Sequence, residues 1–276
     1  MASMILIARL APPPLHRCFR AVYRLLLAVI AIATISGRAS GETLMVAAAA
    51  DLKFALDDVL VDFRKDNPEH DVKVTYGSSG VLFSQIDNGA PFDLFLSADV
   101  KFPRQLIEQG KAEKDSLFLY AIGHVVVWVP KDSKLDITQL GAKALLDPSV
   151  RKVSIANPDV APYGAAALAA LKSLALHESL KSKLVLGENV AQAAQFIEAG
   201  AADAGLISLS LALSPKMKYA GRYWEVPKDA YPKLEQAGVI RRGAANPAGA
   251  KQLKEYIRSP AGRAVLQRYG FALPEA

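Results

Sequence analysis

The sequence contains a single cysteine among 276 residues, and this residue, Cys18, lies close to the N-terminus. A chain without a second cysteine forms no internal disulfide and has no cluster of thiolates to bind a metal. Histidine is almost as scarce. After residue 41 only His70, His124 and His177 remain, and none has a neighbour at a metal-binding spacing such as H-x-x-x-H. We therefore expect no directly coordinated metal ion and no resident cofactor.

Runs of lysine and arginine are absent after residue 41. The formal net charge of the whole chain is +6. Residues 1–41 contain no acid and five arginines, which are Arg9, Arg17, Arg20, Arg24 and Arg38. The rest of the chain therefore carries about 6 − 5 = +1 charge. Because no basic patch or run remains there, we expect no nucleic-acid partner.

The sequence also lacks an apolar run long enough to span a bilayer near its basic N-terminus. Leu25–Ile35 is apolar over only about 11 residues, whereas a membrane helix needs ~20. Arginines precede this run, and the small residues Ala39, Ser40 and Gly41 follow it. This order is typical of a secretory signal. We predict that residues 1–41 are a cleavable signal peptide and that the mature protein is periplasmic.

Strand-like and helix-like segments alternate along the rest of the chain, which predicts an α/β fold. The expected strands of the first half are 44–46, 72–76 and a segment from 91 to 96, and those of the second half are 152–156, 184–186 and 204–207. The same strand-then-helix unit recurs in each half, as two similar lobes require, each a mostly parallel sheet flanked by helices. We expect crossover strands at 125–129 and 237–241. Lobe 1 then comprises 42–122 and 238–276, and lobe 2 comprises 123–237.

Four turns follow expected strands and precede expected helices. They are Ala50-Asp51, Gly77-Ser78-Ser79-Gly80, Pro162-Tyr163-Gly164 and Asn189-Val190. The first N–H groups of a helix have no internal partner, and ligands of open α/β sheets bind where strands end. Such turns can hold an oxyanion without any basic side chain. Taken singly, each is better explained as an ordinary loop between a strand and a helix, because such N-caps are common. None contains a histidine to activate a nucleophile, so binding is favoured over catalysis.

Several motifs resemble those of the periplasmic molybdate-binding proteins of ABC importers. They are 46–52 (VAAAADL), Ser78-Ser79, 89–99 (GAPFDLFLSAD), Asn157-Pro158, Pro162-Tyr163-Gly164, Glu188-Asn189-Val190, Ala204-Gly205-Leu206 and 268–271 (RYGF). The resemblance implies a two-lobed periplasmic-binding-protein fold of type II. It also implies capture of molybdate, and of the similar tungstate, for a membrane permease, with the oxyanion as ligand and not as cofactor. We expect a monomer.

The resemblance also implies five ligand-binding positions. They are Asp51, Ser79, Tyr163, Val190 and Ser208, with Tyr163 and Val190 acting through their backbone N–H groups. Two positions depart from the family pattern. Asp51 stands where a hydroxyl residue is usual, and Ser208 stands where a longer tyrosine is usual. The phenol of Tyr163 is a candidate for the donor that Ser208 is too short to supply.

Asp51 leaves the identity of the oxyanion open. A carboxylate ~4 Å from another negative charge costs about 4 kcal/mol at an effective dielectric constant of 20. In one interpretation Asp51 turns away and caps its own helix by accepting from the N–H of Lys53 or Phe54, and Lys53 neutralises it. In the other it faces an oxyanion that carries a proton, which keeps phosphate or another protonated oxyanion as an alternative. Sulfate, and an enzyme built on the same fold, are further alternatives.

Overall fold

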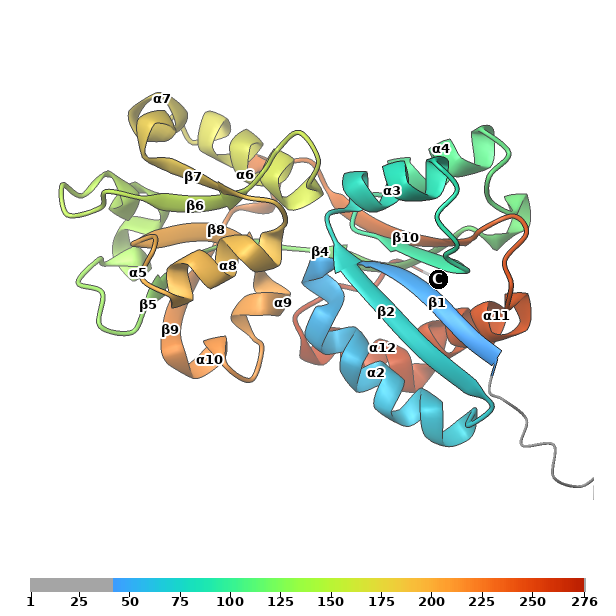
Figure 1. The fold of residues 1–276 in the computed structure, drawn as a ribbon. Coiled ribbons are helices and arrows are strands. Elements are labelled where there is room, and N and C mark those ends of the chain that lie inside the picture. The colour runs from blue at the N-terminus through green and yellow to red at the C-terminus, as the bar shows by residue number, and fades with distance from the viewer. Residues whose placement is uncertain (1–41, 276) are drawn as a thin grey trace, which may run out of the picture. The chain divides into compact units, whose positions relative to one another are not determined.

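Two five-stranded sheets organise residues 42–275, the part of the chain that this computed structural model describes (Figure 1). The predicted signal segment lies outside the described residues. The first sheet has the strand order β2 (His70–Gly77), β1 (Glu42–Ala49), β3 (Leu94–Ser97), β10 (Leu234–Ile240) and β4 (Phe118–Gly123). The second has the order β7 (Leu184–Gly187), β6 (Val153–Ala156), β8 (Ala204–Ser208), β5 (Val125–Pro130) and β9 (Gly221–Glu225). We call each sheet with its helices a lobe, the first being lobe 1.

Each sheet contains one strand that runs against the others. In lobe 1, β1 pairs in parallel with β2 and β3, whereas β10 is antiparallel to both β3 and β4. In lobe 2, β6 pairs in parallel with β7 and β8, and β5 is antiparallel to β8 and β9. The reversed strands are the ones that the chain enters directly after crossing from the other lobe. The predicted α/β fold with two mostly parallel sheets is confirmed.

The chain passes between the sheets at two places. β4 ends at Gly123 and β5 begins at Val125, so His124 makes the first crossing. The return follows β9, passes through η5 (Lys228–Ala230) and enters lobe 1 at Leu234, where β10 begins. Because only a few residues separate the strands at each crossing, we expect relative movement of the lobes to occur at this short hinge.

Helices cover both faces of each sheet. In lobe 1 these are α2 (Lys53–Asp66), α11 (Pro247–Arg258) and α12 (Pro260–Arg268) on one face, and α3 (Ser79–Asp87) and α4 (Lys101–Glu108) on the other. In lobe 2 they are α5 (Ile137–Leu140), α6 (Pro162–Ser173), α7 (His177–Leu180), α8 (Val190–Glu198), α9 (Leu209–Ala212) and α10 (Met217–Ala220). The short 3-10 turns are η1 (Ala50–Leu52), η2 (Lys114–Ser116), η3 (Gly141–Leu146) and η4 (Lys181–Lys183). None of the helices among residues 42–275 combines the length and hydropathy of a membrane span.

The spacing of apolar residues explains why the helices pack on the sheets. α2 buries Leu56, Val59, Leu60 and Phe63, which recur every three or four residues and therefore share one face. Burying each such side chain contributes about 1.5–3 kcal/mol relative to leaving it exposed. Buried apolar side chains contribute in the same way to the second core, which surrounds β5 and its fully buried Trp128.

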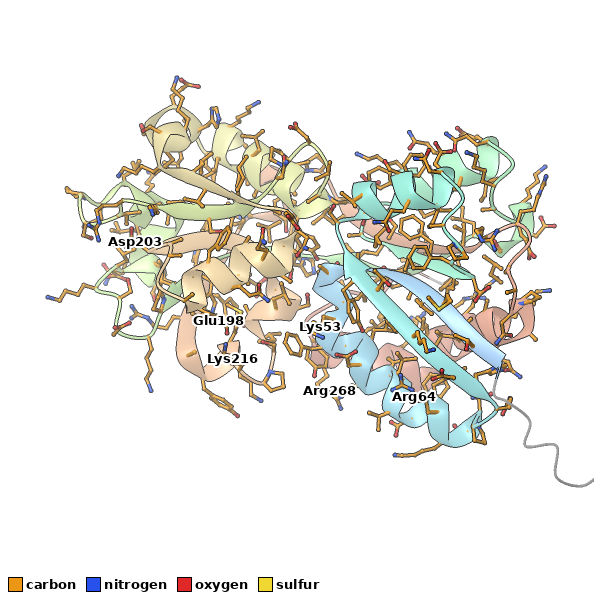
Figure 2. All side chains as sticks on the ribbon, viewed as in Figure 1. Lys53, Arg64, Glu198, Asp203, Lys216 and Arg268 are labelled. Carbon is orange, nitrogen blue, oxygen red and sulfur yellow. The ribbon has the colours of Figure 1, made fainter. Side chains whose placement is uncertain are left out.

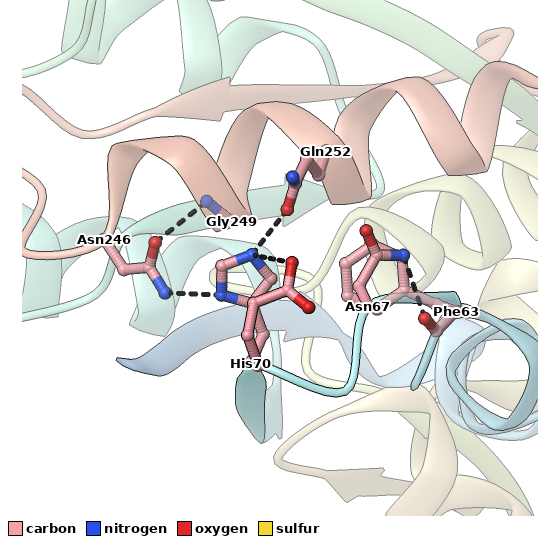
Figure 3. Close-up of polar contacts among 7 residues, drawn as sticks. Phe63, Asn67, His70, Asn246, Gly249 and Gln252 are labelled. Carbon is pink, nitrogen blue, oxygen red and sulfur yellow. Dashed lines mark hydrogen bonds and ion pairs between the residues drawn. The ribbon is translucent and has the colours of Figure 1, made fainter. Parts of the chain in front are cut away.

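A buried histidine ties α11 to the sheet edge of lobe 1 (Figure 3). His70 begins β2, and its Nδ1 lies 3.1 Å from Asn246 Nδ2 while its Nε2 lies 2.5 Å from Gln252 Oε1. The amide of Asn246 donates to Nδ1, so the ring proton sits on Nε2 and is donated to Gln252. Asn246 Oδ1 accepts from Gly249 N and caps α11. We therefore assign His70 a structural role, which is to hold the first turns of α11 against the start of β2.

Candidate functional site

The carboxyl ends of the strands in both lobes surround one small space. The space is small, with a volume of about 10 Å³ open to the centre of a water molecule, and it is partly open to solvent. It is lined by the ends of β1, β2 and β3 from lobe 1, and by the first turns of α6 and α8 from lobe 2. Four of the five predicted ligand-binding residues line it, namely Asp51, Ser79, Tyr163 and Val190. The structure therefore brings together residues that lie up to 139 positions apart in the sequence (190 − 51).

The first turn of α3 supplies two serine hydroxyl groups. Ser79 is 1% exposed, and its Oγ accepts a hydrogen bond from Ala98 N at 2.9 Å. Because that contact uses a lone pair, the hydroxyl proton of Ser79 remains available to a ligand. Ser78 precedes the helix, and its Oγ is buried without a hydrogen-bond partner. A buried hydroxyl without a partner is uncommon, and here it borders the same space.

The first turn of α8 supplies a backbone donor. Asn189 is the N-cap, and its Oδ1 accepts from the N–H groups of Ala191 and Gln192 at 3.0 and 3.1 Å. Val190 occupies the first helical position, where the N–H has no acceptor inside the helix. The cap therefore satisfies the neighbouring donors and leaves the N–H of Val190 for a ligand.

The first turn of α6 brings Tyr163 to the crossing between the lobes. Tyr163 is 3% exposed, and its Oη lies 3.3 Å from Gln236 Nε2 on β10. Burial raises the pKa of Tyr163 well above its ordinary value, and the negative charge of Asp51 adds to the effect. The phenol is thus a neutral donor. A Cβ at Gly123 would lie 2.1 Å from Tyr163 Oη, so only glycine permits this approach at the end of β4.

Asp51 does not cap its helix, so that interpretation of the sequence was wrong. It lies within η1, and neither η1 nor α2 has a side-chain cap. Its Oδ2 instead accepts from Gln236 Nε2 at 2.5 Å, while its Oδ1 is buried without a partner. Asp51 is 1% exposed, and burial raises its pKa to about 6 despite the hydrogen bonds from Gln236 and Tyr163. The physical reason is that the carboxylate finds its donors on β10 of its own lobe and on α6 of the other lobe, and not in the first turn of its own helix.

Lys53 does not neutralise Asp51. Its Nζ lies 3.4 Å from Asp57 Oδ2, one turn further along α2, and 4.9 Å from the ring centroid of Tyr76. No ion pair involves Asp51 within residues 42–275. The carboxyl group is therefore held by uncharged donors alone.

Ser208 lies outside the lining of the space. It is fully buried at the N-cap of α9, where its Oγ accepts from Leu211 N at 3.3 Å and lies 3.0 Å from Ser210 Oγ. Ser210 in turn donates to the backbone oxygen of Asp51 at 2.8 Å. The structure thus places Ser208 behind the turn that carries Asp51, where it supports a contact between the lobes.

The sequence reasoning did not single out Gln236. This residue is fully buried in β10, donates to both Asp51 and Tyr163, and leaves its own Oε1 without a partner. A signal was present, because an amide directly before an expected apolar strand must find hydrogen-bond partners if it is buried. The sequence could not identify those partners, since Gln236 and Asp51 are 185 positions apart.

Two further contacts join the lobes around the space. Gly80 N donates to Val160 O at 2.9 Å, and Ser210 Oγ donates to Asp51 O. A Cβ at Gly80 would lie 2.6 Å from Val160 O, so the second glycine of the Gly-Ser-Ser-Gly turn allows α3 to approach the opposite lobe. The arrangement can enclose a small anion with hydroxyl and N–H donors from both sides.

Comparison with known proteins identifies the family. Residues 44–272 match the family model described as bacterial extracellular solute-binding protein. The chain belongs to this family. The solute-binding protein is 39% identical over 236 residues to the molybdate-binding protein ModA of Azotobacter vinelandii, which covers 85% of this chain and 92% of the relative. It is 35% identical over 202 residues to the molybdate-binding protein ModA of Rhodobacter capsulatus, covering 73% and 77%.

The fold of the solute-binding protein also matches a solved relative. The structure of the periplasmic molybdate-binding protein of Azotobacter vinelandii superposes with a TM-score of 0.79 at 34% identity, covering 84% of this chain and all of the other. The resemblance predicted from the sequence motifs is thereby confirmed, as is the two-lobed fold.

Proposed function

We propose that this protein captures a molybdate dianion, or the similar tungstate, between its two lobes for delivery to the membrane permease of an ABC importer. The observation that carries the proposal is the set of buried, uncharged donors from both lobes around one small space. Curated relatives named as molybdate-binding proteins support the choice of anion.

Each lining residue has a distinct role in this proposal. Ser79 and Ser78 donate their hydroxyl protons from lobe 1, and Val190 and Tyr163 donate backbone N–H groups from lobe 2. A hydrogen bond to a charged acceptor contributes about 1.5–3 kcal/mol. The oxygens of the anion accept these bonds, so the metal atom within the oxyanion needs no direct protein ligand. Ser208 is left out because it does not line the space.

The lobes close on the anion by bending at the two crossings. The anion first meets one lobe and then bridges both, and the contacts of Gly80 with Val160 and of Ser210 with Asp51 support the closed form. The permease recognises that closed form. No bond is made or broken in this process, so we infer a binding protein without catalytic activity. We also infer that it acts as a monomer and has no nucleic-acid partner.

We also infer export to the periplasm. The family description supports an extracellular role. Residues 1–41, with four arginines before a short apolar stretch and small residues after it, serve as the cleavable signal peptide in this proposal.

Titration calorimetry of the purified protein against molybdate, tungstate, sulfate and phosphate tests the ligand. We expect binding of molybdate and tungstate at micromolar concentration or tighter, and no heat from sulfate, because a rigid set of donors that fits the larger anions holds sulfate poorly. Tight binding of phosphate with no response to molybdate would overturn the proposal. That result would favour the second candidate, a receptor for a protonated oxyanion, for which Asp51 offers an acceptor.

A further inference from the structure

The carboxyl group of Asp51 is an unusual member of an anion site. One of its oxygens, Oδ2, accepts from Gln236, and the other, Oδ1, is buried with no donor within the described residues. An ionised carboxylate in a protein interior ordinarily receives hydrogen bonds on both oxygens. A protonated carboxyl instead has an O–H to donate. Because Asp51 lines the anion space, its unpartnered Oδ1 fits a neutral acid with a proton to donate better than a charged one.

The surroundings of Asp51 offer no positive charge to stabilise its ionised form. From β4 and α6 it faces the phenols of Tyr120 and Tyr163, and from β10 it faces the amide of Gln236. Burial raises the pKa of both phenols well above the ordinary value, so both are neutral. Lys53 on α2 is paired with Asp57.

The other elements that pack against Asp51 bring no charged side chain next to its carboxyl group. α9 contributes Ser210, which donates to the backbone of Asp51, and the first turn of α8 contributes Val190. The acid of α8, Glu198, lies in its last turn and is paired with Lys216 at 3.2 Å (Figure 2). An anion that enters the space therefore brings a second negative charge next to a desolvated carboxyl group, and only a proton can relieve the repulsion.

We propose that Asp51 is neutral when the cleft is loaded and donates its Oδ1 proton as a hydrogen bond to the anion, so that each dianion is captured together with one proton from solvent. This inference rests on the proposed function. Burial already raises the pKa of free Asp51 to about 6, and the bound dianion raises it further. Asp51 thus serves as a specificity-determining donor that binds dianions most tightly on the acid side of neutrality.

One proton also lies between Asp51 and the bound anion when the ligand brings that proton itself. With phosphate the proton resides on the ligand and Asp51 accepts it, and with molybdate, a dianion near neutral pH, the proton resides on Asp51. The two cases differ in where the proton comes from, since only the second takes it from the buffer. Calorimetry in buffers of different ionisation enthalpy measures this quantity directly.

Molybdate binding to the full-length or processed protein should be measured at pH 5, 6, 7 and 8 in two buffers of different ionisation enthalpy. We expect uptake of nearly one proton per molybdate at pH 8 and little uptake at pH 5. The dissociation constant should rise about tenfold per pH unit above pH 7, because the free carboxylate must then take up a proton to bind. Proton uptake near zero at pH 8 would overturn the inference while leaving molybdate binding intact.

Variants separate Asp51 from other titrating groups. Asp51→Asn keeps a neutral donor and Asp51→Ser keeps a hydroxyl, so both should bind molybdate without proton uptake and with a pH-independent dissociation constant. Asp132→Asn makes the same chemical change on an exposed loop and should behave like the parent protein. Persistence of full proton uptake in both Asp51 variants would overturn the assignment. Absence of molybdate binding to the parent at every pH would instead overturn the proposed function itself.

Discussion

The two lobes address the same space with different chemistry. Lobe 1 presents side chains, namely the hydroxyls of Ser78 and Ser79 and the carboxyl of Asp51, whereas lobe 2 presents the backbone of Val190 and Tyr163. A backbone N–H is kept on substitution by any residue except proline, and it does not titrate. A side-chain donor can be removed by substitution, and the carboxyl of Asp51 also titrates. In the proposed site we therefore expect selectivity and pH response to depend mainly on lobe 1, while lobe 2 contributes backbone donors whose chemistry stays constant.

Replacing the carboxyl of lobe 1 should have the largest effect. Asp51 has a folded pKa raised to about 6, above the unfolded value of 3.8, so its contribution to stability is present below pH 3.8 and lost as the pH rises through 6. Asp51→Asn avoids that loss. We expect the ligand-free variant to be more stable than the parent by about 3 kcal/mol at pH 8 and equally stable near pH 4.

Urea denaturation at both pH values measures this difference. The amide of the new asparagine can donate to Gln236 Oε1, which has no partner in the parent, once the Gln236 amide turns over. Asp132→Asn, on an exposed loop, is the matched control. An equal change in stability at pH 4 and pH 8 would show that the raised pKa is not the cause.

Removing a hydroxyl donor of lobe 1 tests its share in binding. Ser79→Ala deletes the hydroxyl and leaves Ala98 N without its acceptor. We expect a loss of molybdate affinity of about 1.5–3 kcal/mol, or roughly 10- to 150-fold, by calorimetry. Ser84→Ala, on the exposed face of the same helix, is the control and should bind like the parent. Full affinity in Ser79→Ala would remove Ser79 from the site.

Crowding the boundary between the lobes tests the position of the Tyr163 phenol. In Gly123→Ala the new Cβ would overlap Tyr163 Oη and approach Gln236 Nε2 to 2.9 Å. We expect a stability loss of about 1–3 kcal/mol from the forced displacement, measured by urea denaturation. Tyr163→Phe removes the clashing oxygen, so the double variant should regain part of the loss. Additive effects would contradict the predicted contact.

Removing the N-cap of α8 in lobe 2 tests how strongly binding depends on the backbone donors of that lobe. Asn189→Ala deletes the acceptor for Ala191 N and Gln192 N, which should cost about 1 kcal/mol of stability. Because the N–H of Val190 remains, we expect molybdate affinity to fall less than in Ser79→Ala. A pH profile of binding like that of the parent is also expected. A loss of affinity larger than that of Ser79→Ala would show that lobe 2 is the more sensitive partner.

Ser208→Ala should have the smallest effect. Its Oγ caps α9 and does not line the anion space, so we expect stability to fall by less than about 1 kcal/mol and molybdate affinity to stay unchanged. Thermal denaturation and calorimetry measure the two quantities. A clear loss of affinity without loss of stability would return Ser208 to the site.

Much of the fold follows from local patterns. The apolar segment at 125–129 predicted β5, and Gly-Ser-Ser-Gly after a β-branched segment marked the end of β2 and the start of α3. Return to lobe 1 was expected at 237, whereas β10 begins at Leu234. The earlier start was not visible because Gln236, a polar residue, interrupts the apolar pattern, and its burial depends on partners elsewhere in the chain.

The sequence by itself determined the turns that end the strands, and with them the hydroxyl and N–H donors at the first turns of the helices. Strand and helix periodicity are local properties, so these turns needed no tertiary information. Only the tertiary structure decided what Asp51 does. Its own first turn offered it a cap, but Gln236 and Tyr163 arrive from distant elements and hold the carboxyl in a dry site. Burial and long-range partners, which no local pattern records, set its charge.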